Sequence, residues 1–160
     1  MSVPQRPDES QYINSLSNDE KQMLDLYAEL ESSKDEKKLI SLVESGQLRP
    51  ADTNKEGQTP IMFAIDSNFS TETVEKLIEL GCDVNVQGED GMTSLHKSFW
   101  LGNKETFEML IRKGADLDIE DESGDSGRSL AESEKPFKKI VDDIMGSPLA
   151  VSMTKSQAEQ

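Results

Sequence analysis

One pattern recurs along this chain with a spacing of 30 to 35 residues, and it constrains the fold more than any other feature. Apolar residues occupy positions i, i+3 and i+4, which places them on one face of a helix. In three of four cases a glycine follows three residues later, where a left-handed residue ends a helix. The triplets are Leu39/Leu42/Val43, Val74/Leu77/Ile78, Phe107/Leu110/Ile111 and Phe137/Ile140/Val141, and the glycines are Gly46, Gly81 and Gly114. Such regular helix ends indicate a repeat protein.

A second set of glycines lies between these helices. Gly57, Gly91 and Gly124 are separated by 34 and 33 residues, and a small residue follows each of them after seven positions. Short polar stretches precede these glycines, at residues 54–56, 88–90 and 121–123. The repeating unit is therefore a polar turn, a first helix, a short link, a second helix and a glycine stop.

Two motifs of this unit resemble the ankyrin repeat. The family pattern G-x-T-P-L-H is similar to residues 57–62 (GQTPIM) and 91–96 (GMTSLH). The family pattern G-A-D-V-N is similar to residues 81–85 (GCDVN) and 114–118 (GADLD). The clear resemblance covers about residues 54–131. It implies an all-α fold, an ankyrin-repeat solenoid of helix-turn-helix units with short β-turn fingers.

The flanking segments fit a longer domain with atypical repeats at both ends. Ser17 and Glu20 have the spacing of a capping box, and Pro136 suits the first turn of a helix. We expect an ankyrin-repeat domain over residues 17–146, with repeats at about 17–53, 54–87, 88–120 and 121–146. The remaining ends are polar and lack periodicity, so we expect disordered tails at residues 1–16 and 147–160.

Charge restricts the class of partner. The 160 residues include 32 acidic and 17 basic side chains, a formal net charge of −15. Binding to nucleic acid or to an anionic membrane depends on Lys and Arg, so we expect neither. No apolar run suits a signal peptide or a membrane helix, and Cys82 is the single cysteine. We expect a protein of the cytoplasm, with the nucleus as an additional location, that is a monomer or part of a hetero-complex.

Nothing in the sequence has the pattern of an active site, so we expect no enzyme, no cofactor and no metal site. The single histidine, His96, ends the second copy of the first motif. The resemblance implies that it bonds to Thr93 and to the backbone of the neighbouring loop. Met62 stands at its place one repeat earlier, so that turn should be held less firmly. Ser94 replaces the usual proline, which loosens a helix start.

Trp100, the single tryptophan, follows the slots that hold the paired alanines of the family, here Ser98 and Phe99. The resemblance implies that Trp100 and Leu101 face the concave groove, where partners bind. The alternative is that Trp100 packs on the neighbouring helix, 71–79. Carrying over the turn tips as well, the resemblance implies these partner-binding residues: Lys55, Glu56, Gln58, Gln87, Glu89, Asp90, Met92, Trp100, Leu101, Glu120, Glu122, Ser123 and Asp125.

These residues form an apolar centre beside an acidic rim. The resemblance and the charge together predict a non-catalytic protein-interaction module whose groove binds a basic, partly apolar segment of a partner protein, as an adaptor or an escort. The alternative is a regulatory or scaffold subunit that docks on an enzyme or complex through its N-terminal helices or C-terminal tail.

Overall fold

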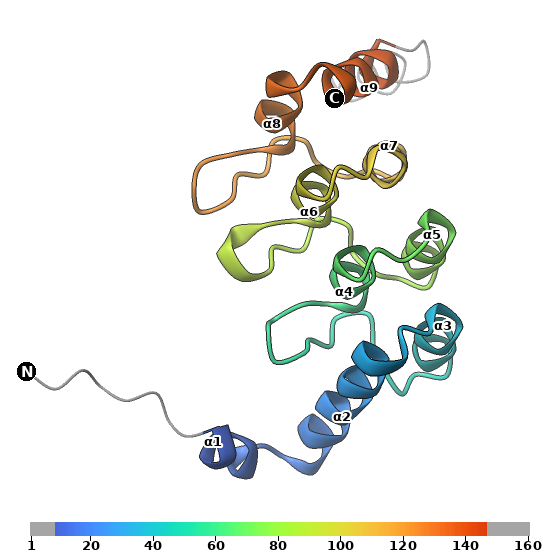
Figure 1. The fold of residues 1–160 in the computed structure, drawn as a ribbon, viewed down its shortest axis with the longest axis vertical. Coiled ribbons are helices and arrows are strands. Elements are labelled where there is room, and N and C mark those ends of the chain that lie inside the picture. Colours follow the sequence, from blue (N-terminus) through green and yellow to red (C-terminus); the bar gives the residue numbers. More distant parts are fainter. Residues whose placement is uncertain (1–8, 147–160) are drawn as a thin grey trace, which may run out of the picture.

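The computed structural model describes residues 9–146, which form a row of stacked helix pairs (Figure 1). Its elements, in chain order, are α1 (Glu9–Ser15), α2 (Asn18–Ser33), α3 (Glu36–Glu44), α4 (Pro60–Asp66), α5 (Thr71–Glu79), the short 3-10 turn η1 (Glu89–Gly91), α6 (Ser94–Trp100), α7 (Lys104–Arg112), α8 (Gly127–Ser133) and α9 (Lys135–Met145). This architecture confirms the expected all-α solenoid of helix-turn-helix units.

The helices stack in two columns. The first helices α4, α6 and α8 pack on one another, and so do the second helices α3, α5, α7 and α9. Each repeat thus contacts only its neighbours, as in other solenoids. Long loops project beside the first helices, before α4, α6 and α8 (Figure 1). We call them finger 2 (residues 54–58), finger 3 (88–92) and finger 4 (121–125).

The core is continuous from α2 to α9. At the N-terminal end, Tyr27 of α2 packs edge-on against Phe63 of α4, with ring centroids 5.5 Å apart, and donates a hydrogen bond to the Asp52 carbonyl. At the C-terminal end, Phe137 of α9 lies 4.8 Å from Phe99 and 4.9 Å from Phe107. These aromatic contacts tie the atypical end repeats to the two central ones.

The start of α2 and the glycines of the fingers have the conformations that the sequence predicts. Ser17 and Glu20 form the expected capping box at the start of α2. The finger glycines Gly57, Gly91 and Gly124 all have φ between +72° and +84°, which glycine adopts without strain. The fingers are turns rather than a sheet, and within residues 9–146 the extended pairing amounts to one isolated bridge, between Glu120 and Ser126.

One segment of the expected N-terminal tail is helical. We expected disorder over residues 1–16, but residues 9–15 form α1. Within it, the Ser15 hydroxyl donates a hydrogen bond to the Tyr12 carbonyl. Tyr12 and Ile13 are 49% and 42% exposed, so α1 is too short and too little packed to produce a core-facing periodicity in the sequence. Residues 1–8 and the expected C-terminal tail, 147–160, lie outside the described residues.

Candidate functional site

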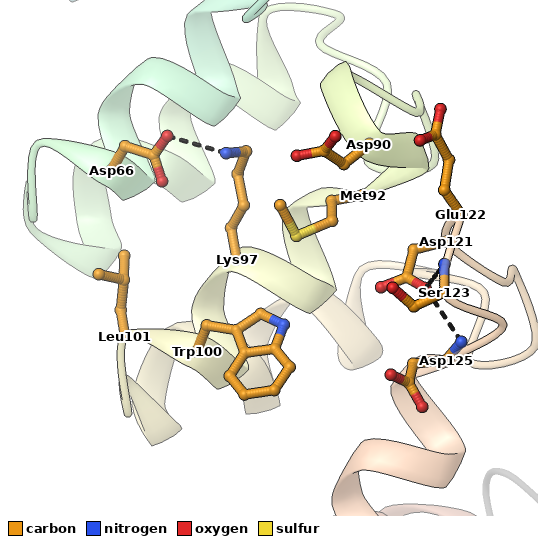
Figure 2. A pocket seen from close by; sticks show the side chains of 10 residues that line it. All are labelled: Asp66, Asp90, Met92, Lys97, Trp100, Leu101, Asp121, Glu122, Ser123 and Asp125. Carbon is orange, nitrogen blue, oxygen red and sulfur yellow. Dashed lines mark hydrogen bonds and ion pairs between the residues drawn. The ribbon is translucent and has the colours of Figure 1, made fainter.

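A groove of about 650 Å³ opens on the finger side of repeats 3 and 4 (Figure 2). The end of α6 forms one wall and fingers 3 and 4 form the other. The residues that line it are Asp66, Asp90, Met92, Lys97, Trp100, Leu101, Asp121, Glu122, Ser123 and Asp125. Seven of these are among the thirteen residues that the sequence predicted as partner-binding, so the structure brings just over half of the predicted set together in one groove.

Trp100 and Leu101 are the exposed apolar part of this groove. Trp100 is the last residue of α6 and is 61% exposed, and Leu101 is 48% exposed. The two preceding residues, Ser98 and Phe99, are buried, and the Phe99 ring supports the Trp100 ring edge-on at 5.3 Å. Trp100 therefore does not fill the core against α5, and its indole is available to a partner.

The carboxylates of the groove divide into two groups. Asp66 forms an ion pair with Lys97 at 2.9 Å and accepts a hydrogen bond from the Gln58 amide. Asp121 accepts the backbone N–H groups of Ser123 and Asp125 at 2.9 and 3.0 Å. Asp66 and Asp121 thus hold the walls of the groove.

The second group is uncommitted. Asp90, Glu122 and Asp125 have side chains without a hydrogen bond or ion pair to any described residue. Because the single ammonium group in the groove, that of Lys97, is already paired, the groove presents a strong excess of negative charge.

Fingers 3 and 4 are joined by hydrogen bonds. Gln87 Nε2 donates to the carbonyls of Gly91 and Glu120, at 3.0 and 2.9 Å. The Glu122 N–H donates to the Asp90 carbonyl at 2.9 Å. Gln87, predicted as partner-binding, therefore has its amide engaged in holding the two fingers together. The Glu120 carbonyl accepts one of these two bonds. The residue itself is exposed, and it does not line the groove.

His96 is a structural hydrogen-bonding residue, as the resemblance implied. It is 1% exposed, so no substrate reaches it. Its Nδ1 accepts the Thr93 N–H at 3.1 Å, which leaves the proton on Nε2. Nε2 donates that proton to the Asp125 carbonyl at 2.7 Å. His96 thus attaches finger 4 to the start of α6.

The other predicted residues lie in neighbouring hollows. Glu56, Gln58 and Glu89 line a hollow of about 140 Å³ between fingers 2 and 3, which shares Asp90, Met92 and Lys97 with the groove. The acidic concave surface is therefore continuous over three fingers. Lys55 is separate from it, since it lines an apolar hollow of about 200 Å³ with residues of α1 and α2.

Comparison with known proteins decides the family. A family model described as ankyrin repeats (3 copies) matches residues 29–121, more than half of the chain. The chain belongs to the ankyrin-repeat family. Ankyrin repeats are in general protein–protein interaction modules and are in general non-catalytic. No curated protein matches the chain.

Among solved structures, the ankyrin-repeat domain of Bcl-3, described as a unique member of the IkappaB protein family, superposes with a TM-score of 0.61. The sequence identity is 24%, which supports the fold alone. The superposition covers 69% of this chain and 47% of the Bcl-3 chain, so this ankyrin-repeat protein spans about half of that structure.

Sequence reasoning missed three groove residues of this ankyrin-repeat protein: Asp66, Lys97 and Asp121. Lys97 lies one turn before Leu101 on α6, so helical spacing alone would have placed it beside the groove. Asp66 is at the end of α4 in the preceding repeat, and no motif marks it. Asp121 occupies the turn position of Asn54, where an Asx side chain is recognisable as a brace for the turn.

The single cysteine has a structural role. Cys82 is buried, and burial raises the pKa of its thiol to about 11, so it is protonated at neutral pH. Within residues 9–146 no group of His, Cys, Asp and Glu side chains has an arrangement that would hold a metal ion. None of the described helices is long and apolar enough to cross a membrane.

Proposed function

We propose that this ankyrin-repeat protein is a non-catalytic interaction module whose acidic and aromatic groove binds a basic, partly apolar segment of a partner protein. The observation that carries the proposal is the exposed pair Trp100 and Leu101, which lines the groove. A tryptophan that is 61% exposed contributes little to folding, whereas in an interface it is the residue type most often found to dominate affinity.

The charge of the rim supports the basic character of the partner. The groove combines five carboxylates with one paired ammonium group. Such a field accelerates encounter with a basic segment and disfavours an acidic one. The role that fits is that of an adaptor or an escort for a basic protein in the cytoplasm or the nucleus.

Affinity capture tests the proposal. Immobilised wild-type protein and the Trp100→Ala variant would be incubated with the same cell extract, and the retained proteins quantified by mass spectrometry. We expect a small set of proteins with basic segments to be retained by the wild type and lost from the variant. Met145→Ala, which removes an exposed apolar side chain of α9 outside the groove, is the matched control, and it should retain the same set.

Two results would contradict the groove as the binding site. One is an identical set of proteins on wild type and Trp100→Ala. The other is a large drop in the melting temperature of Trp100→Ala, because it would show that the side chain stabilises the fold rather than an interface.

A second candidate function is supported by a separate observation. Tyr12 and Ile13 of α1 are large, apolar and exposed, and they line the hollow of about 200 Å³ with Leu24, Ala28 and Lys55. This surface suits a regulatory or scaffold subunit that docks on a larger complex through its N-terminal helices.

Paired substitutions separate the two functions. Tyr12→Ser with Ile13→Ser removes the apolar surface of α1 and leaves the groove unchanged. If α1 is the docking surface, this variant loses the partner and Trp100→Ala keeps it. If the groove is the binding site, the pattern is reversed. Deletion of residues 147–160 tests docking through the C-terminal tail in the same assay.

A further inference from the structure

We propose that the segment bound in the groove inserts an arginine, whose guanidinium group lies on the Trp100 indole and pairs with the Asp125 carboxylate, while the free carboxylates of Asp90 and Glu122 attract a further basic group of the same segment. This inference rests on the proposed function and names the chemistry of the partner at that site. It selects arginine over lysine and over a purely apolar anchor.

The first step of the argument is the state of the carboxylates. Asp66 and Asp121 are engaged with Lys97 and with the backbone of finger 4, whereas Asp90, Glu122 and Asp125 have no partner among the described residues. All three free carboxylates line the same groove as Trp100. An apolar anchor alone would leave them without a counter-charge when the groove closes over it, and that desolvation is unfavourable.

The second step is the geometry of the aromatic side chain. Figure 2 shows the Trp100 ring between Leu101 on one side and the finger that carries Ser123 and Asp125 on the other. An occupant that lies on the indole therefore faces the Asp125 carboxylate, while the carboxylates of Asp90 and Glu122 lie beyond Met92 at the other end of the groove (Figure 2). A guanidinium group suits this arrangement because it is planar, stacks on aromatic rings and donates to carboxylates with a fork of N–H groups.

The third step is the comparison with lysine. An ammonium group is compact and more strongly hydrated than a guanidinium group, and it has no planar face to lay against the indole while it donates to a carboxylate. The groove already contains such a group: Lys97, at 14% side-chain exposure, pairs with Asp66 rather than with the three free carboxylates. A point charge is thus accommodated at Asp66, and the open site beside Trp100 has the breadth for a planar, delocalised cation.

The residues next to the arginine in the partner segment can be inferred from the same walls of the groove. Met92 and Leu101 provide apolar contact on either side of Lys97, and Glu56 and Glu89 continue the acidic surface between fingers 2 and 3. We therefore expect an apolar residue next to the arginine, and a second basic residue towards finger 2.

Selection from a displayed library of random 12-residue peptides tests this inference. Peptides would be selected on the wild-type protein, and those that also bind Trp100→Ala would be subtracted. The inference predicts that arginine is enriched at one fixed position and that lysine is not. Enrichment of lysine to the same degree would overturn the inference and leave the proposed function intact, whereas enrichment of peptides without a basic residue would overturn both. Absence of any peptide specific for the wild type would overturn both.

The intrinsic fluorescence of the protein gives the second measurement, since Trp100 is the single tryptophan of the chain. The best selected peptide would be compared with versions in which lysine or uncharged citrulline replaces the arginine. We expect the arginine peptide to change the Trp100 emission and to bind about tenfold more tightly than either version. Equal affinity of the lysine version would contradict the inference.

Charge variants locate the pairing. Asp125→Asn removes the free carboxylate that faces the Trp100 ring, and it should reduce the preference for arginine over citrulline, whereas Glu122→Gln should reduce that preference less. Asp143→Asn, which removes one exposed carboxylate of α9 far along the chain from the fingers, is the control with the same change of net charge. An equal effect of Asp143→Asn would show general electrostatic attraction in place of a defined site.

Discussion

Finger 3 differs from the fingers on either side of it. In finger 2 the Asn54 Oδ1 accepts two backbone N–H groups, from Glu56 and Gln58, and in finger 4 Asp121 does the same for Ser123 and Asp125. The same position in finger 3 is Gly88, which has no side chain. The middle finger of the concave surface therefore lacks the internal brace that its two neighbours have.

The preceding repeat explains why position 88 of finger 3 is a glycine. A Cβ atom at Gly88 would come within 2.9 Å of the Met62 sulfur. Met62 stands where the next repeat has His96, which binds Thr93 and the backbone of the following finger. Met62 makes neither bond, and the Thr59 hydroxyl beside it is buried without a hydrogen-bond partner among the described residues.

The difference shows how the concave surface is organised. Finger 3 is hydrogen-bonded to finger 4 through Gln87 and Glu122, while on its other side it packs on the Met62 side chain. The groove at Trp100 lies on the hydrogen-bonded side, so a partner meets a fixed surface there and less ordering accompanies binding. The hollow between fingers 2 and 3 is the more adaptable half.

The largest expected effect concerns the contact between fingers 3 and 4. Gly91 has φ +72°, and a Cβ there would come within 3.1 Å of the Glu122 nitrogen and 3.2 Å of the Asp121 Cα. We expect Gly91→Ala to lower the free energy of unfolding by about 3 kcal/mol, from left-handed strain and crowding together. Urea unfolding measures it. Gly124→Ala has the same strain without a neighbour, so about 1.5 kcal/mol is expected. Equal losses would contradict close contact between the fingers.

The next largest effect is expected when His96 and Met62, which occupy equivalent positions in neighbouring repeats, are exchanged for one another. His96→Met gives the third repeat the arrangement of the second, and removes the bonds to Thr93 and Asp125. We expect a loss of about 2 kcal/mol, because the buried Thr93 N–H is left unpaired and finger 4 loses its bond to α6, while the Asp125 carbonyl keeps only the Asp121 N–H. Thermal unfolding measures the loss. A change below about 0.5 kcal/mol would mean that the histidine bonds contribute little beyond filling space.

The reverse exchange should have a smaller effect of opposite sign. Met62→His supplies an acceptor for Thr59 and a donor to the backbone of finger 3, and we expect a gain of about 1 kcal/mol. Slower amide hydrogen exchange in residues 88–92 should accompany the gain. A loss of stability would show that the methionine packing beside Gly88 outweighs the missing bonds.

The smallest expected effect is at the start of α6. Ser94 occupies the first helical position, where α4 has Pro60, and its buried hydroxyl has no partner among the described residues. Thr93 has ψ 173°, which suits a following proline. We expect Ser94→Pro to raise stability by about 0.7 kcal/mol through reduced freedom of the unfolded chain. A lower melting temperature would show that the ring does not fit.

Much of the fold follows from the sequence because its determinants are local. Glycine spacing, the capping box at Ser17 and the T-x-x-H turn of Thr93 and His96 each act within a few residues, and the structure confirms all three. The signal for α1 is absent because its seven residues pack too little to show periodicity.

The candidate site is predictable only in part. Trp100 and Leu101 follow from their place after two small-residue slots, since those slots face the core. The pairing of Lys97 with Asp66 and the division between engaged and free carboxylates depend on contacts between repeats, 31 residues apart in the chain. No local pattern encodes which carboxylate meets which cation, so sequence alone gave a uniform acidic rim.

The affinity of a captured partner segment for wild type and for Trp100→Ala tests the central claim most directly, with both proteins shown to unfold at the same temperature. Isothermal titration would give the two dissociation constants. We predict that the substitution weakens binding by about 2 to 3 kcal/mol, on the order of 30- to 150-fold, while the free energy of unfolding changes by less than about 0.5 kcal/mol. Equal affinities for the two proteins would contradict the claim that Trp100 anchors the partner.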